Sequence, residues 1–162
     1  MDNTMALLLS DTYKQCHDRM YPKGLTKLVS YWVPRKSMLE NQNEMVFFGL
    51  QAFIKEYLMG YFQKNFFDLS EDEMLTLYTD SMDVQIGRDN YDLDKIVELH
   101  RLGYLPLEIR ALPEGTLVPM GVPCIEITNT DDKFAWLVQW IECILPVSYT
   151  HLRAHETVLD LV

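Results

Sequence analysis

The spacing of apolar residues changes near Gly103, and this change limits the folds that the chain can adopt. Over residues 46–61 apolar side chains recur every three or four positions, which is typical of an amphipathic helix. The capping-box sequence at 70–73 predicts a second helix that runs to about Met82. A third helix is predicted over 93–99, with Gly103 where a left-handed residue ends a helix. The middle of the chain is therefore predicted to be helical.

After Gly103 apolar and polar residues alternate instead, which predicts strands. The alternation covers 105–111 and 124–128, and a Pro-Glu-Gly turn at 113–115 lies between them. An earlier segment, 27–33, is rich in β-branched and aromatic residues and is predicted to be a further strand. Strands joined by turns favour antiparallel pairing. The sequence therefore predicts an α+β fold in which helices pack on a small, mostly antiparallel sheet.

Two shorter helices are predicted near the ends of this region. Ser10 and Asp11 are good N-cap residues for a helix through Met20. Thr130 and Asp131 are predicted to cap a last amphipathic helix that ends near residue 145. Residues 1–145 are accordingly interpreted as one domain.

Composition excludes several classes of function. The 162-residue chain has a net charge of −10, and its 14 basic residues are scattered, which argues against nucleic-acid binding. It has no apolar stretch of the roughly 18 residues that a membrane span needs, so no membrane association is expected. Its three cysteines contain no Cys-x-x-Cys pair, which argues against a disulfide framework or zinc site. A cytoplasmic protein is the expectation.

Residues 146–162 do not continue the pattern of the domain. They resemble a peptide that arises when adapter or vector sequence is translated, so we interpret them as a non-native tail. His151 and His155 lie four residues apart, as in some metal sites, but Leu152 stands where a zincin-type motif has glutamate. No metal ligands are therefore predicted.

Candidate ligand-binding residues occur at two places. Asp11 and Tyr13 would present a carboxylate and a stacking ring at a helix start, although an ordinary N-cap explains the same residues. Arg35 follows a strand and a proline on a loop that an anion could reach, although it is otherwise an ordinary surface arginine. Glu108, Glu114 and other nearby glutamates invite an acid–base interpretation, but charge pairing is the simpler one.

Six segments, in order and covering nearly all of residues 6–145, resemble the nicotinamide phosphoribosyltransferase family. They are LLLSDTYKQCH at 7–17, MYP at 20–22, LVSYWVPR at 28–35, MVFFGLQAFIKEYL at 45–58, YLPLEIRALPEGTLVPMGVP at 104–123, and ITNTDDKFAWLVQWIECIL at 127–145.

This resemblance implies a type II phosphoribosyltransferase, which joins nicotinamide to 5-phosphoribosyl pyrophosphate to give nicotinamide mononucleotide and pyrophosphate in NAD biosynthesis. It further implies Mg²⁺, assistance by ATP, and a head-to-tail homodimer with the active site at the interface. Tyr13 matches the aromatic residue that stacks on nicotinamide in the partner subunit's pocket, and Asp11 matches a carboxylate that shapes that pocket. Arg35 matches a basic residue near the phosphate or pyrophosphate site.

The resemblance ends at Leu145, before the barrel domain that carries the family's other substrate-binding residues. The chain is therefore expected to be an N-terminal fragment with the barrel missing, with no catalytic residue of its own and no activity when alone. Two alternatives remain. One is the nicotinate phosphoribosyltransferase branch, and the other is a non-catalytic interaction module that docks on a full-length homologue.

Overall fold

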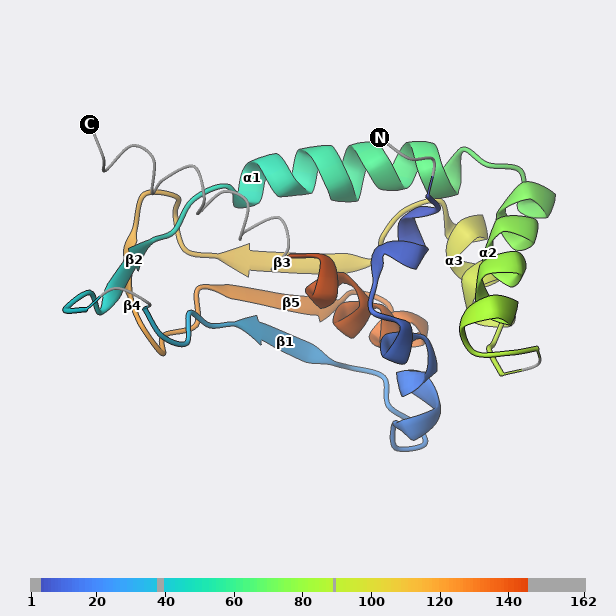
Figure 1. The fold of residues 1–162 in the computed structure, drawn as a ribbon, viewed down its shortest axis with the longest axis horizontal. Helices are drawn as coiled ribbons and strands as arrows, with labels where there is room; N and C mark the ends of the chain where they lie inside the picture. The colour runs from blue at the N-terminus through green and yellow to red at the C-terminus, as the bar shows by residue number, and fades with distance from the viewer. Residues whose placement is uncertain (1–3, 38–39, 89, 146–162) are drawn as a thin grey trace.

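A computed structural model describes residues 4–37, 40–88 and 90–145. Three strands form the main sheet: β1 (Val29–Trp32), β5 (Ile125–Asn129) and β3 (Leu107–Ala111). Their order is β1-β5-β3, and both pairings are antiparallel (Figure 1). The predicted α+β class and antiparallel pairing are confirmed. The predicted tail, 146–162, lies outside the described residues.

A second, two-stranded sheet corrects one prediction. β2 (Glu44–Val46) pairs antiparallel with β4 (Leu117–Pro119), whereas the sequence pattern had assigned Val46 to a helix. Gly49 explains the difference, because its φ of 96° turns the chain just before the helix begins at Leu50. The residues before this turn are extended and free to pair with β4.

One long helical segment runs along the β3 side of the main sheet (Figure 1). It comprises α1 (Leu50–Phe53) and two wider, π-helical stretches, η3 (Ile54–Tyr61) and η4 (Gln63–Phe67). The predicted amphipathic helix is therefore confirmed from Leu50 onward.

Two further helices pack at one end of the molecule (Figure 1). α2 (Glu71–Gln85) starts at Ser70 with the predicted capping box, in which both reciprocal hydrogen bonds with Glu73 are present. α3 (Asp94–Leu102) ends at Gly103, which takes the predicted left-handed conformation with φ of 78°. Both helix boundaries thus follow from local sequence signals.

Short 3₁₀ helices flank the domain. η1 (Ala6–Leu9) and η2 (Thr12–Met20) lie in the N-terminal segment, so the helix predicted to reach Met20 is present as a 3₁₀ helix. η5 (Asp132–Phe134) leads into helical residues 135–145, here called the final helix. The carboxylate of Asp131 accepts a hydrogen bond from the Lys133 amide, which confirms that residue as a cap.

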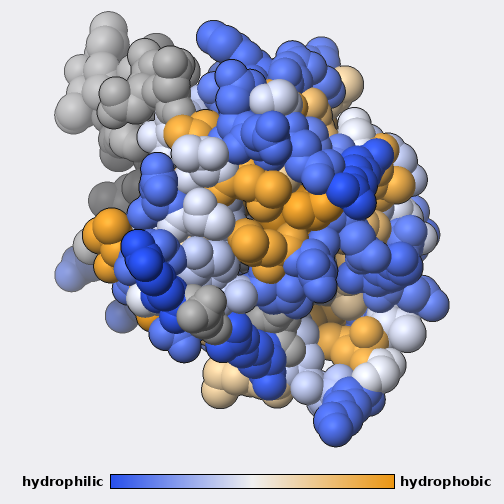
Figure 2. Space-filling view, turned by 90° about the vertical axis from the view of Figure 1, so that its right-hand side faces the viewer, coloured by the Kyte–Doolittle hydropathy of each residue, from blue (hydrophilic) through white to orange (hydrophobic). Residues whose placement is uncertain are grey.

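The final helix lies in the middle of the hydrophobic core. Eight of its eleven residues are buried, and it packs between the main sheet and the N-terminal segment (Figure 1). α2 in contrast leaves Leu77 and Val84 exposed, and Figure 2, which looks onto this end, shows apolar surface among hydrophilic residues. None of the helices in the described residues is long and apolar enough to cross a membrane.

Candidate functional site

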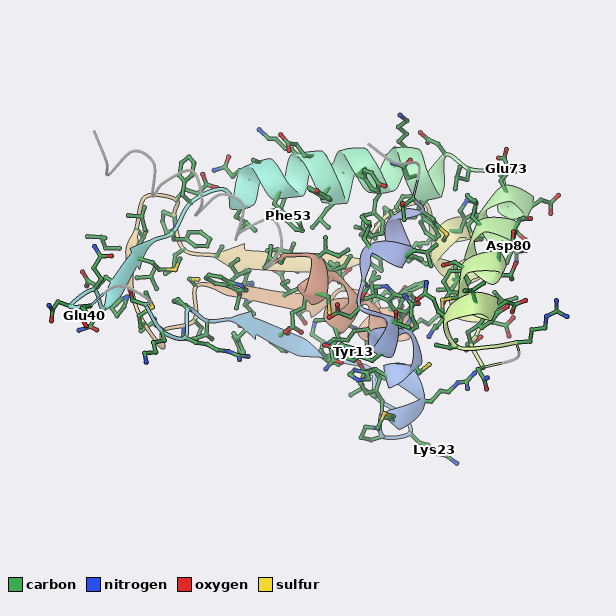
Figure 3. The ribbon with its side chains drawn as sticks, in the orientation of Figure 1. Tyr13, Lys23, Glu40, Phe53, Glu73 and Asp80 are labelled. Atoms are coloured by element: carbon green, nitrogen blue, oxygen red, sulfur yellow. The ribbon has the colours of Figure 1, made fainter. Side chains whose placement is uncertain are left out.

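Tyr13 is an exposed aromatic residue at the place where η2 meets the final helix. Its side chain is 58% exposed, and Figure 3 shows it beside η2 near the start of β1. Partial desolvation raises the pKa of the Tyr13 phenol, and Cys143 and a hydrogen bond with the Asp11 carboxylate act in the same direction. The structure therefore brings the two predicted residues, Asp11 and Tyr13, together.

Two neighbouring side chains of η2 contact the Tyr13 ring. The ammonium of Lys14 lies 5.5 Å from the ring centroid, in a cation–π arrangement. The imidazole of His17, four residues further along, meets the ring edge-on with centroids 5.1 Å apart and planes at 60°. Two side chains of η2 thus contact the Tyr13 ring, while 58% of the residue stays exposed.

His17 is in turn connected to the final helix. Its Nδ1 lies 3.2 Å from Oε1 of Gln139, and the hydroxyl of Tyr21 donates to the same oxygen at 2.7 Å. His17, Tyr21 and Gln139 were not predicted from the sequence to belong to the site. The position of His17 four residues after Tyr13, on the same face of a helix, could have indicated it, whereas no local sequence pattern indicates Gln139.

A buried polar network fixes the backbone beneath this site. Gln15, 1% exposed, donates from Nε2 to the Leu7 carbonyl at 3.4 Å and accepts from the Tyr78 hydroxyl at 3.1 Å. The indole Nε1 of Trp140 donates to the same Leu7 carbonyl at 2.8 Å. Buried hydrogen bonds are costly to break, so the N-terminal segment is anchored to both α2 and the final helix.

The final helix also joins the site to the main sheet. The hydroxyl of Ser30 in β1 donates to Glu142 Oε2 at 2.8 Å. Burial raises the pKa of the neighbouring Cys143 thiol, although the Lys14 ammonium acts in the opposite direction. Because only a thiolate is a strong nucleophile, Cys143 is suited to packing rather than covalent chemistry.

Arg35 lies away from Asp11 and Tyr13. It is exposed and follows Pro34, whose carbonyl accepts a hydrogen bond from the Gly121 amide at 2.7 Å. Four residues, 31–34, lie between Ser30 and Arg35, so a fully extended chain would place their Cα atoms roughly 16 Å apart at about 3.3 Å per residue. Within one chain the predicted binding residues therefore lie at two separate positions, Asp11 with Tyr13 at one and Arg35 at the other.

The glutamates of the main sheet are paired with a cation. On its exposed face Arg110 contacts Glu108 at 2.9 Å and approaches Glu126 to 4.0 Å. A hydrogen bond with Glu126 also raises the pKa of Tyr31 on the adjacent strand. Charge pairing, the simpler of the two interpretations, is what the structure shows for these residues.

Other possible sites among the described residues would involve metal ligands, a surface groove or the cysteines. No three His, Cys, Asp or Glu side chains among them gather closely enough to hold a metal ion. A groove of about 460 Å³ lies between the long helical segment and β3, and its lining is mainly apolar, with Gln63 and Tyr104 the side chains that carry polar groups. All three cysteines are free of disulfide bonds.

Comparison with known proteins assigns the chain to a family. Residues 5–109 match the family model described as nicotinamide phosphoribosyltransferase, N-terminal domain. The chain belongs to this family. A relative from Acinetobacter baylyi named nicotinamide phosphoribosyltransferase is 39% identical in an alignment of 140 residues that covers 83% of this chain. A relative of the same name from Xanthomonas campestris is 31% identical over 86% of this chain.

The family match covers a part of its members' length. The aligned region spans 28% of the Acinetobacter baylyi relative and 27% of the Xanthomonas campestris relative. The chain thus spans under a third of the nicotinamide phosphoribosyltransferases that it matches, and it aligns with an N-terminal domain.

Proposed function

We propose that this chain is the N-terminal domain of an enzyme that joins nicotinamide and 5-phosphoribosyl pyrophosphate to give nicotinamide mononucleotide and pyrophosphate. Family membership supports the reaction. The observation that supports a substrate-binding role for this domain is Tyr13, an exposed aromatic ring on an anchored backbone. Such a ring is suited to stacking on a flat heteroaromatic substrate.

In this proposal Tyr13 and Asp11 enter the nicotinamide pocket of a partner subunit in a homodimer. The exposed part of the Tyr13 ring stacks on the pyridine ring of the substrate. The Asp11 carboxylate binds the Tyr13 hydroxyl and adds a negative acceptor to the pocket wall. The contribution of the domain is therefore binding and orientation, which raise the rate by holding the nicotinamide nitrogen in line with the reacting carbon.

Arg35 is proposed to bind phosphate or pyrophosphate oxygens. A guanidinium presents two parallel donors that match such oxygens, and Arg35 is exposed on the loop that follows β1. Because it lies far from Tyr13 in the same chain, the two residues are proposed to serve different parts of the active site or different pockets of the dimer.

Mg²⁺ and ATP are likewise proposed from family membership. The described residues gather no His, Cys, Asp or Glu cluster that could hold a metal ion. A cytoplasmic location is proposed as well, and the three free cysteines support a reducing compartment.

A hybrid enzyme tests the proposed function. The matched residues of this chain would replace the aligned region of the Acinetobacter baylyi relative, and nicotinamide mononucleotide would be measured by chromatography. The hybrid should form this product from nicotinamide, and the 162-residue chain alone should form none. A hybrid that folds but forms no nicotinamide mononucleotide would contradict the proposed function.

Substitution of Tyr13 tests the proposed role of the domain. Tyr13→Ala in the hybrid should raise KM for nicotinamide about tenfold, since an aromatic pair contributes up to about 1.5 kcal/mol. Tyr13→Phe should stay close to the unmodified value because it keeps the ring. Tyr104→Ala is the matched control, since this tyrosine is similarly exposed (55%) but lies beside the groove. Equal KM values for all variants would contradict the role of Tyr13.

A further inference from the structure

We propose that His17 is a positioning residue that holds the Tyr13 ring in its binding orientation, and that Gln139 holds His17. This inference rests on the proposed function, because it assigns the groups that prepare Tyr13 for its ligand. Gln139, in the final helix and 122 positions after His17 in the chain, thereby contributes to the nicotinamide pocket.

The two rings are arranged as an interacting aromatic pair. Their centroids lie 5.1 Å apart and their planes meet at 60°, so an edge of one ring points toward the face of the other. Aromatic pairs favour this geometry because the positive edge of one ring meets the negative face of the other. The contact occupies part of the Tyr13 ring and leaves the side chain 58% exposed for a ligand.

Gln139 determines how the imidazole is placed. Its Oε1 lies 3.2 Å from Nδ1 of His17 and accepts a hydrogen bond from Tyr21 at 2.7 Å. A carbonyl oxygen only accepts, so this pairing requires a proton on Nδ1 and fixes the tautomer of the ring. Because Gln139 belongs to the final helix, the imidazole is tied to the core of the domain.

Orientation matters because Tyr13 is a surface side chain. The buried side chains of Gln15 and Trp140 fix the backbone of the N-terminal segment by donating hydrogen bonds to the Leu7 carbonyl, six residues before Tyr13. An exposed side chain loses rotational freedom when it binds a ligand, and contacts that hold it beforehand reduce that loss. His17 and Lys14 are the ring contacts from η2 that the structure shows, and His17 is the one attached to the core.

A double-mutant cycle in the hybrid enzyme distinguishes positioning from plain stabilisation. His17→Ala should raise KM for nicotinamide about threefold, with KM for 5-phosphoribosyl pyrophosphate unchanged. In the Tyr13→Ala background the same substitution should add nothing, because the ring to be positioned is absent. Gln139→Leu should act in the same direction as His17→Ala.

His100→Ala is the matched control. This histidine also bonds a carbonyl, that of Leu69 at 3.0 Å, and also meets an aromatic ring edge-on, that of Phe66 at 5.4 Å, but in α3. Its substitution should lower stability without changing KM for nicotinamide. A His17→Ala effect that is absent, or that is equally large with and without Tyr13, would overturn the proposal.

A measurement on the 162-residue chain separates this inference from the proposed function. NMR should give nuclear Overhauser cross-peaks between ring protons of His17 and Tyr13. The ring-proton resonances of Tyr13 should also shift in the Gln139→Leu variant. Missing cross-peaks overturn the positioning role whatever the hybrid does. If the cross-peaks are present but Tyr13→Ala leaves KM unchanged, the proposed function of Tyr13 fails instead, and His17 positions a ring that nicotinamide does not use.

Discussion

Glu114, which the sequence offered as a possible acid–base residue, has a structural role at the start of a helix. Its carboxylate Oε1 accepts a hydrogen bond from the Gln51 amide at 2.9 Å, at the start of the long helical segment. The first amides of a helix have no partner within the helix, so a carboxylate from another segment can cap them. Gly115 next to it has a φ of 88°, which lets the turn bring the glutamate into place.

Substitution of Glu114 should therefore affect stability. Glu114→Ala should lower the free energy of unfolding by about 1 kcal/mol, the usual effect of losing a helix cap. Urea denaturation of the 162-residue chain measures this quantity. Glu114→Gln keeps an acceptor oxygen and should lose less, so an equal loss in both variants would argue against the capping role.

The predictability of site residues depends on their separation in the chain. Asp11 and Tyr13 could be predicted as a pair because they lie two positions apart at a helix start. The contact between His17 and Gln139 joins residues 122 positions apart, and no local pattern predicts it. It depends on the final helix packing against η2, which is a property of the tertiary fold.

At the level of elements, α2 and α3 are joined by a two-point ion pair. Arg101 donates from Nε and from the terminal nitrogen to the two carboxylate oxygens of Glu71, at 2.9 and 2.8 Å. The hydrogen bond from Arg101 lowers the pKa of Glu71 below its ordinary value of 4.5. The pair is exposed, so its contribution to stability is small.

The sign of the pKa shift gives a pH dependence. A carboxylate whose pKa is lowered in the folded state stabilises the fold above its unfolded pKa, and this contribution disappears as pH falls through the folded pKa. Arg101→Met should therefore lower Tm slightly at pH 7, and the difference from the unmodified chain should shrink as pH is lowered below 4.5. Thermal melts across this range would show it. A difference that stays constant into strong acid would mean that the pair is not responsible.

Helices whose ends carry capping residues could be predicted well from the sequence. The capping box of Ser70 and the left-handed Gly103 fixed the ends of α2 and α3. β2 could not be predicted, because it has only three residues and Val46 also fits the spacing of the helix that follows. Its pairing depends on β4, about 70 residues away, and only the folded chain brings the two together.

At the level of the whole molecule, the final helix connects the core with the site. Trp140, 1% exposed, donates to the Leu7 carbonyl, while Gln139 and Glu142 reach His17 and Ser30. The strand order β1-β5-β3 could not be predicted from sequence either, because it places β5, the last strand of the described residues, between two earlier ones. Both features arise only when distant segments pack together.

The two buried tryptophans of this helix offer a matched comparison. Trp140→Phe removes a buried hydrogen bond as well as volume and should cost about 2–3 kcal/mol of unfolding free energy. Trp136→Phe should cost less, because its indole nitrogen is buried with no hydrogen-bond partner among the described residues. Hydrogen exchange of residues 6–20 should also accelerate in Trp140→Phe. Equal costs, with unchanged exchange, would argue against the anchoring of the N-terminal segment.

The most direct test of the proposed site is a crystal structure of the hybrid enzyme with nicotinamide bound. We expect the pyridine ring to stack on Tyr13 of one subunit, next to Asp11, while the other subunit supplies the remaining contacts. His17 should keep its contacts with Tyr13 and Gln139. A structure in which nicotinamide is bound and Tyr13 remains in solvent, away from the ligand, would contradict the proposed role of this domain in binding nicotinamide.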